Sequence, residues 1–337
     1  SVDSLMIISE IPAYKLPLPL DVNDFGVRGT LFWIGILLCI IGLYCFIRFF
    51  VRIIFTTELF RNNQYNKLGL VSLKGYFGTT NVFLVGVPYS GKSEWLKNQF
   101  AGDKAQHYIN LNSIKKLEDV KAQIAKCHDA EIIVIDHFEY GFRDFAVARR
   151  RLRLFEELKH LDNKRILVVS NIHPRMFLAE YPKEPEKTNE DGEKIASVDN
   201  TFNDCDRWAK LLGCYHKIYF PASGVVEKET NKKGDLIDRE CDDSYFLRSQ
   251  KALIRESLTN EETEHPLNDE EIILRIESLA HVYYNSIWSS LSEEEQYILY
   301  DIAQDGLVNL KNRDVLTMLL NKGLLVYENR FRMMNES

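Results

Sequence analysis

The sequence predicts an α/β chain: a parallel sheet flanked by helices, preceded by one transmembrane helix and followed by a helical domain. Three observations predict this order. An uncharged apolar run lies near the start, buried-strand patterns ending in polar residues fill the middle, and apolar residues at helix spacing fill the end. The 337 residues are enough for two packed domains and a membrane anchor.

Composition narrows the function classes. Charged residues make up 27% and hydrophobic residues 45% of the chain, a balance typical of globular structure. The net charge of -7 argues against a protein that coats nucleic acid. The six cysteines include no C-x-x-C pair, so we expect reduced thiols and no zinc site. Because the chain begins at Ser1 and not at Met, we expect a processed chain or a piece of a longer one.

The run from Gly29 to Ile47 predicts a membrane-spanning helix, because it holds no charged residue. About 20 residues rising about 1.5 Å each cover a ~30 Å hydrocarbon core. A cleavable signal peptide is the alternative, but its apolar region is shorter and lies at the extreme N-terminus. We expect an external segment at 1–28, the span at 29–55 and a juxtamembrane linker at 56–77.

The flanking charges predict the orientation of the span. Basic residues follow it at Arg48, Arg52, Arg61, Lys67 and Lys74, whereas acidic residues predominate before it. The more basic flank stays in the cytoplasm. We therefore expect a single-pass protein of the cell membrane, with everything after residue 55 cytoplasmic. Its expected partners are the lipid bilayer and proteins in the membrane or N-terminal to the span.

A phosphate-binding loop is predicted from the pattern G-x-x-x-x-G-K-S at Gly86–Ser93, between an apolar strand-like run and a helical stretch. Glycines let the backbone wrap closely around phosphate, and a helix N-terminus favours an anion. Lys92 would reach the β- and γ-phosphates of ATP, and the Ser93 hydroxyl would ligate Mg²⁺. The expected binding residues are Gly86, Val87, Pro88, Tyr89, Ser90, Gly91, Lys92, Ser93 and Glu94.

A carboxylate for the metal is predicted at Asp136, which follows the buried-strand run Ile132 to Ile135. It would hold Mg²⁺ through water. Glu139 is the candidate to polarise the attacking water. His137 occupies the place where a second acid most commonly follows the first. The alternative is that Glu139 only caps the next helix.

A further buried strand is predicted at Arg165–Asn171, ending in polar side chains. If it lies between the phosphate-loop strand and the Asp136 strand, it aims Ser170 or Asn171 at the γ-phosphate. The alternative is a simple turn before His173-Pro174.

The order of these motifs resembles AAA+-related STAND NTPases, signal-transducing P-loop ATPases that switch between closed and assembled states. The resemblance covers roughly 78–220 and, more loosely, 266–335. It rests on G-x-x-x-x-G-K-S, the strand ending D-H-F-E, an Arg-rich helix and V-V-S-N-I-H-P. It implies a P-loop NTPase sheet at 78–222, with Asn171 at the catalytic position called sensor 1.

The same resemblance implies a homo-oligomer in which a neighbouring subunit supplies an arginine to the γ-phosphate. The helix predicted at Phe145–Leu161 offers several, and two others compete: Arg149, Arg150, Arg151, Arg153, Arg175 and Arg207. The ordinary explanation of this helix is a solvated basic face with Arg153–Glu157 pairing.

Residues 223–265 are predicted as loop and linker, and 266–337 as a helical and winged-helix-like domain. The expected elements are a helix at Leu267–Trp288, a capping box at Ser292 and Glu295, a helix at Asn312–Asn321 and a hairpin at Leu324–Met333. Winged helices often read DNA, but this recognition helix offers only Arg313. We therefore expect a lid or interaction surface and regard DNA binding through 266–335 as the lesser alternative.

Together these patterns predict a membrane-anchored, ATP-binding and ATP-hydrolysing STAND-like switch that oligomerises or signals in a nucleotide-dependent way. Two alternatives stay open. One is an AAA+-type motor acting on protein or DNA, and the other is a nucleotide-stabilised membrane scaffold.

Overall fold

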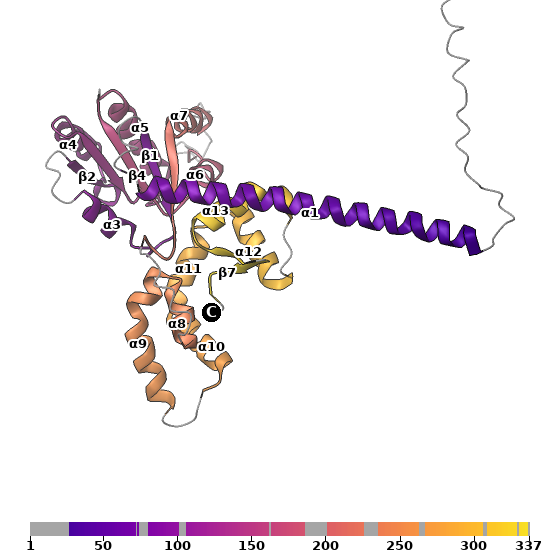
Figure 1. The fold of residues 1–337 in the computed structure, drawn as a ribbon. Coiled ribbons are helices and arrows are strands. Elements are labelled where there is room, and N and C mark those ends of the chain that lie inside the picture. Colours follow the sequence, from indigo (N-terminus) through magenta and orange to yellow (C-terminus); the bar gives the residue numbers. More distant parts are fainter. Residues whose placement is uncertain are drawn as a thin grey trace, which may run out of the picture. The chain divides into compact units, whose positions relative to one another are not determined.

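The computed structural model describes residues 27–71, 73, 80–100, 106–161, 163–185, 201–225, 235–262, 267–305, 309–328 and 330–335. The chain divides into two compact units, Ser1–Glu58 and Leu59–Ser337. Figure 1 shows helix α1 (Val27–Val71) in indigo; its residues up to Glu58 belong to the first unit. The predicted external segment lies outside the described residues as far as residue 26.

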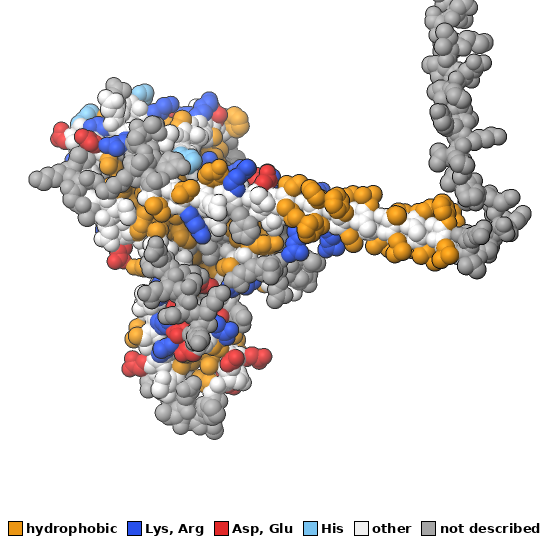
Figure 2. Space-filling view, viewed as in Figure 1, with side chains coloured by type: hydrophobic (Ala, Val, Ile, Leu, Met, Phe, Trp, Pro, Cys, Tyr) orange, Lys and Arg blue, Asp and Glu red, His pale blue; other side chains and the backbone are white. Residues whose placement is uncertain are grey.

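Helix α1 is longer than the sequence predicted. The span predicted at 29–55 is helical, and the helix continues through the expected linker as far as Val71. No Gly or Pro interrupts residues 56–68, so nothing in that stretch ends the helix. The large apolar side chains from Leu31 to Ile54 are exposed, apart from the half-exposed Ile36, and Figure 2 shows apolar side chains along the helix. Among the described helices, α1 alone is long and apolar enough to cross a membrane by length and composition.

The second unit is built on a five-stranded parallel sheet with the strand order β2-β3-β4-β1-β5. Figure 1 labels its strands β1, β2 and β4. Its strands are β1 (Asn81–Gly86), β2 (Gln106–Asn110), β3 (Ile132–Asp136), β4 (Arg165–Ser170) and β5 (Tyr215–Phe220). Strand β4 lies between β1 and β3, which is the position that the sequence argument required. Strands β2 and β5 were not predicted, because their partly exposed side chains form no continuous apolar run.

Side chains alternate along each strand and give the sheet two buried faces. On β1, Val82 and Leu84 face one cluster, together with Leu70, Leu73 and helix α3 (Lys92–Gln99). Phe83 and Val85 face the opposite cluster. That second face is covered by α4 (Leu117–Cys127), α5 (Phe145–Lys159), α6 (Pro174–Ala179) and α7 (Thr201–Gly213). The predicted fold class, a parallel sheet flanked by helices, is confirmed.

The prediction that 223–265 is only loop and linker is wrong, because this segment contains α8 (Leu236–Asp242) and α9 (Tyr245–Glu262). Asp235 caps α8 by accepting a hydrogen bond of 2.8 Å from the Asp238 amide. Arg255 of α9 forms ion pairs with both aspartates. The charges that suggested a surface loop therefore join one helix to the next.

The helix predicted at Leu267–Trp288 is two helices, α10 (Asp269–Leu279) and α11 (His281–Ser289), separated at Ala280. Their apolar spacing continues across the break, so the pattern did not reveal it. The predicted capping box is confirmed: the Glu295 amide donates to Ser292 Oγ at 3.3 Å, and the Ser292 amide donates back to the Glu295 carboxylate. The elements that follow are α12 (Glu293–Asp305), the short helix η2 (Leu310–Asn312), α13 (Arg313–Asn321), β6 (Leu325–Glu328) and β7 (Arg330–Met333). The last two pair antiparallel, as predicted. A second short helix, η1 (Leu111–Ser113), follows β2 in the region of the parallel sheet.

The end of α13 is joined to α12 by a buried ion pair and to the segment after β5 by a backbone hydrogen bond. Lys322 Nζ lies 2.5 Å from Glu295 Oε1, and both side chains are 1% exposed. The Lys322 carbonyl accepts a hydrogen bond of 2.7 Å from the Ala222 amide, just beyond β5. Because Lys322 is buried, it is not available as a DNA contact on the surface of the C-terminal elements.

Candidate functional site

The phosphate-binding pattern forms a tight loop between β1 and α3, as the sequence predicted. A Cβ added at Gly86 would lie 2.8 Å from the Phe220 carbonyl oxygen of the neighbouring strand. Gly91 has a φ of 83°, and a Cβ there would lie 2.9 Å from the ring of Tyr245. Both positions therefore require glycine, one for close packing and the other for its left-handed backbone.

Lys92 lies folded back into this loop with its ammonium buried. Its Nζ donates to the carbonyl oxygens of Gly86 at 3.0 Å and Val87 at 2.6 Å, and to Asn171 Oδ1 at 2.8 Å. These acceptors are neutral, and no carboxylate forms an ion pair with Lys92 among the described residues. Burial lowers the pKa of Lys92 to about 8. A buried cation held only by neutral acceptors fits an anionic ligand such as a phosphate.

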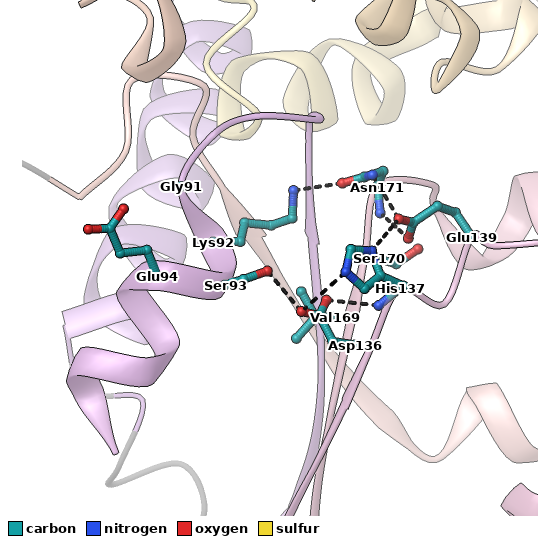
Figure 3. Close-up of a pocket in the computed structure, with 10 residues that line it drawn as sticks. All are labelled: Gly91, Lys92, Ser93, Glu94, Asp136, His137, Glu139, Val169, Ser170 and Asn171. Atoms are coloured by element: carbon teal, nitrogen blue, oxygen red, sulfur yellow. Dashed lines mark hydrogen bonds and ion pairs between the residues drawn. The ribbon is translucent and has the colours of Figure 1, made fainter. Parts of the chain in front are cut away.

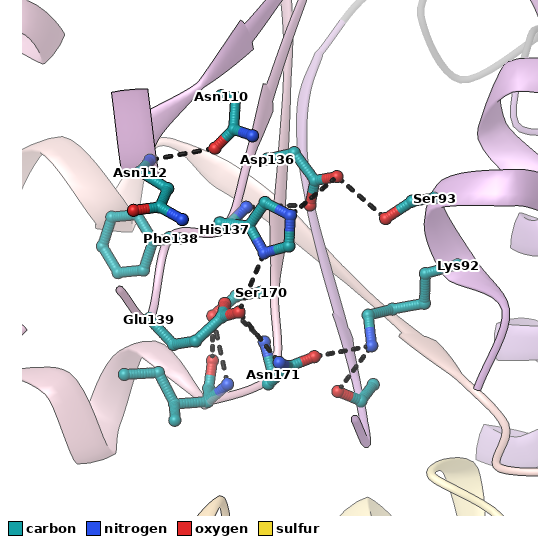
Figure 4. Close-up of polar contacts among 12 residues, drawn as sticks. Lys92, Ser93, Asn110, Asn112, Asp136, His137, Phe138, Glu139, Ser170 and Asn171 are labelled. Atoms are coloured by element: carbon teal, nitrogen blue, oxygen red, sulfur yellow. Dashed lines mark hydrogen bonds and ion pairs between the residues drawn. The ribbon is translucent and has the colours of Figure 1, made fainter. Parts of the chain in front are cut away.

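Ser93 and Asp136 meet on the α3 side of the sheet (Figure 4). Ser93 Oγ donates to Asp136 Oδ2 at 2.8 Å, and the His137 amide donates to Asp136 Oδ1 at 2.8 Å. The Asp136 carboxylate is only 3% exposed. A hydroxyl and a carboxylate are oxygen donors of the kind that Mg²⁺ prefers, so this pair fits the predicted metal site.

Glu139 bonds to Asn171 and does not cap a helix. The Asn171 side-chain amide donates to Glu139 Oε1 at 2.8 Å, and its backbone amide donates to Oε2 at 3.1 Å. The alternative that Glu139 caps the next helix is wrong, because α5 begins at Phe145 with Asp144 as its N-cap.

His137 stands beside both acids in the place of the commoner second carboxylate. It has a φ of 61°, and its Nδ1 lies 3.5 Å from Glu139 Oε1. Its hydrogen bond to Glu139 raises the pKa of His137, with the nearby Asp136 charge adding to the effect. The left-handed backbone at His137 turns the chain so that Glu139 approaches Asn171.

The structure decides between the two polar residues that end β4. Asn171 Oδ1 accepts from Lys92, so its side-chain amide joins Lys92 to Glu139 (Figures 3 and 4). Ser170 instead accepts from the Ile172 amide and donates to the Ile172 carbonyl within its own turn. Of the two strand-end residues, Asn171 is therefore the one that bonds to Lys92 and Glu139.

These side chains line one cavity of about 130 Å³ (Figure 3). Its lining residues are Gly91, Lys92, Ser93, Glu94, Asp136, His137, Glu139, Val169, Ser170 and Asn171. Of the nine predicted loop residues, four line it. Val87, Pro88 and Ser90 are buried within the loop, and Tyr89 faces outward.

Helices α9 and α11 contact the same loop, although no pattern in the sequence indicates these contacts. The Tyr245 hydroxyl donates to Glu94 Oε2 at 2.5 Å. The ring of Tyr89 packs against Phe246, which stacks on Tyr283 with ring centroids 4.8 Å apart. More than 130 residues separate these aromatic side chains from the loop, so only the tertiary fold brings them there.

Of the six candidate arginines, three bond to groups of their own chain, two are exposed, and Arg150 is half-buried. The expected solvated face of α5 is wrong for Arg151, which is 2% exposed and donates to the Phe138 carbonyl at 2.9 Å. Arg207 pairs with Glu156 and Asp204, and Arg149 lies 3.5 Å from Asp204. Arg153 and Arg175 are exposed.

A loop of the phosphate-binding pattern leaving β1, Asp136 ending β3 and β4 inserted between the two strands are the arrangement of a P-loop NTPase fold. No protein-family model matches the chain. No curated protein matches it.

Several solved structures are similar to the chain. Domain III of the replication initiation protein DnaA from Thermotoga maritima is 17% identical and covers 64% of this chain and 92% of that chain, with a TM-score of 0.39. The RuvB Holliday junction branch migration motor of Thermotoga maritima is 16% identical and covers 82% and 91%, with a TM-score of 0.32. AMPPCP-bound DnaA from Aquifex aeolicus is 14% identical and covers 68% and 64%, with a TM-score of 0.29. The likeness concerns the fold alone.

Proposed function

We propose that the chain is a membrane-anchored, ATP-binding and ATP-hydrolysing molecular switch of the STAND kind. The observation that carries this proposal is the buried Lys92 ammonium, which lies in a ring of neutral oxygens beside the Ser93–Asp136 pair. A cation, a helix N-terminus and two oxygen donors at one point are the parts that a nucleotide triphosphate requires.

Lys92 and the loop amides would bind the phosphates. On binding, Lys92 exchanges its bonds to the neutral Gly86 and Val87 carbonyls for bonds to phosphate oxygens, whose negative charge adds to the attraction. The N-terminus of α3 adds its dipole to the same place. Ser93 and Asp136 would hold Mg²⁺, which neutralises charge on the phosphates when it is bound.

Glu139 would orient the attacking water and accept its proton. In the structure its carboxylate bonds to Asn171, whose other side-chain atom bonds to Lys92. When Lys92 moves to phosphate, the Asn171 oxygen loses its donor, and the side chain can then turn its NH2 group from Glu139 toward the nucleotide. Occupation of the phosphate site would thereby change the bonding of Glu139 through one asparagine.

The helices that contact the loop support a switch. Tyr245 touches Gly91 and bonds to Glu94, so a change in the loop on binding is transmitted to α9. Helix α1 would anchor the chain in the lipid bilayer, because its exposed apolar side chains need cover from water. The basic residues after the span would place the NTPase in the cytoplasm.

Binding is tested with Lys92→Ala in the detergent-solubilised chain, with Lys121→Ala, an exposed lysine on α4, as the matched control. We expect Lys92→Ala to lose most binding of a fluorescent ATP analogue and Lys121→Ala to bind like the wild type. Equal binding by all three proteins would refute the nucleotide site.

Turnover separates the switch from its alternatives. Slow hydrolysis with retained ADP supports the switch, and rapid turnover stimulated by a protein or DNA partner supports an AAA+-type motor. Binding without turnover supports a nucleotide-stabilised scaffold. For the anchor, a reporter fused at residue 337 should be active in the cytoplasm, and activity on the opposite side would refute the orientation.

A further inference from the structure

We infer that Tyr108 is a positioning residue for the metal carboxylate: its phenol holds Asp136 in the orientation that meets Ser93. The Tyr108 hydroxyl donates a hydrogen bond to Asp136 Oδ2, the same oxygen that accepts from Ser93 Oγ. This inference rests on the proposed function and extends it to a residue on β2 that no motif in the sequence marks.

The sheet register explains why Tyr108 reaches this carboxylate. Tyr108 on β2 pairs with Val134 on β3, so the two side chains lie on the same face of the sheet. Asp136 stands two residues after Val134 and shares that face. Diagonal neighbours of this kind are within reach of an aromatic side chain. The hydrogen bond therefore follows from the strand pairing as well as from the side-chain positions.

The face in question is the one that α3 covers. Val134 belongs to the cluster that contains Leu96 of α3, and Ser93 begins the same helix. Asp136 thus receives hydroxyl donors from two sides, from Ser93 on α3 and from Tyr108 on β2. Its other oxygen accepts the His137 amide at 2.8 Å. With three donors on two oxygens, the carboxylate has little freedom to rotate.

Tyr108 acts as a neutral donor and not as a metal ligand. The Tyr108 hydroxyl donates to a carboxylate oxygen, so the phenol carries its proton, as an ordinary tyrosine does at neutral pH. A carboxylate that ligates a metal is commonly oriented by such a hydrogen bond, and loss of the partner typically lowers metal affinity by about 10–100-fold. Tyr108 is 39% exposed, so removal of its hydroxyl leaves no sealed cavity.

The test is Tyr108→Phe, which keeps the ring and removes only the hydroxyl. The matched control is Tyr297→Phe, at a 69% exposed tyrosine on α12. Mn²⁺ serves as the probe: it is titrated into each full-length protein with AMPPCP, and free Mn²⁺ is measured from its electron paramagnetic resonance signal. AMPPCP binding in EDTA and the thermal midpoint are recorded for the same samples to show that each variant is folded.

We expect Tyr108→Phe to weaken Mn²⁺ binding by roughly tenfold or more, with unchanged AMPPCP binding in EDTA, and Tyr297→Phe to match the wild type. Mn²⁺ binding within twofold of the wild type, or tighter, would overturn the positioning by Tyr108 and leave the nucleotide site standing. A wild-type protein that binds neither AMPPCP nor Mn²⁺ would overturn the proposed function and this inference together. Parallel losses in EDTA and in Mn²⁺ would show a structural role only and also overturn it.

Discussion

Asn171 donates two hydrogen bonds to Glu139, one from its side chain at 2.8 Å and one from its backbone at 3.1 Å. Only the first is lost in Asn171→Ala, which also breaks the link to Lys92. We expect ATP hydrolysis to fall roughly a hundredfold, because the base is no longer oriented, while ATP affinity changes little. Single-turnover hydrolysis and analogue binding measure the two effects. Ser170→Ala is the matched comparison, and an equal loss in both variants would contradict the assignment.

Substitutions of Glu139 and Asp136 should affect different steps, hydrolysis in the first case and binding of Mg·ATP in the second. Glu139→Gln keeps the shape of the side chain, accepts only one of the two Asn171 hydrogen bonds and removes the base, so ATP should stay bound and turn over slowly. Asp136→Ala removes the partner of Ser93, so binding of Mg·ATP itself should weaken. Binding is measured with and without Mg²⁺. Normal hydrolysis by Glu139→Gln would show that another group activates the water.

Removal of one partner of the buried Lys322–Glu295 pair should destabilise the chain more than replacement of both partners by apolar residues. Both side chains are 1% exposed, so Lys322→Met leaves an uncompensated carboxylate and should destabilise the chain by about 3–5 kcal/mol. The double variant Lys322→Met with Glu295→Leu should recover most of that loss, because no buried charge remains. Thermal midpoints of the single and double variants test this. A double variant as unstable as the single one would show that the charges themselves hold α13 in place.

His173 should make the chain sensitive to acid. Its Nδ1 accepts from the Arg175 amide at 3.1 Å and its Nε2 lies 3.2 Å from the Tyr219 hydroxyl, an arrangement that suits the neutral ring. Burial is the main reason that the pKa of His173 is lowered to about 3. The nearby positive charges of Lys322, Lys217 and Arg175 also lower it.

Between the ordinary pKa of 6.5 and about 3, the unfolded chain binds a proton at this position that the folded chain does not. Stability is therefore fully present above pH 6.5 and falls as the pH drops below it, by up to about 2 kcal/mol at pH 5. Thermal midpoints at pH 7.5 and pH 5 measure the loss. His173→Asn retains a capping side chain without the titration and should lose less. Equal losses in both proteins would assign the acid sensitivity to other groups.

Arg175 is the best candidate for an arginine that a neighbouring subunit would supply to the γ-phosphate. Arg151 is buried against its own chain, and Arg207 is paired with two acids. Arg175 is exposed and lies four residues after Asn171. If the chain forms homo-oligomers with shared sites, Arg175→Ala should lose hydrolysis and keep ATP binding. Mixing it with Lys92→Ala should restore some turnover, and Arg153→Ala serves as the comparison. Activity that is independent of protein concentration, with no rescue on mixing, would point to a self-sufficient monomer.

Local patterns in the sequence were enough to predict the strands whose ends form the candidate site. Buried parallel strands form continuous apolar runs, so the sequence predicted β1, β3 and β4, together with the polar ends of β3 and β4. The glycine and lysine pattern identified the loop because the same backbone geometry recurs wherever a strand, phosphate and helix meet. Capping boxes are equally local, and the one at Ser292 and Glu295 formed as predicted.

The tertiary structure alone decided which side chains meet across distant segments. The choice of Asn171 over Ser170 depended on the turn after β4, and the burial of Arg151 and Lys322 depended on partners far along the chain. Tyr108 reaches Asp136 only because β2 pairs with β3 in one particular register. A short, half-exposed strand carries no periodic signal of its own, and pairing registers and buried charge partners are long-range properties that residue spacing does not encode.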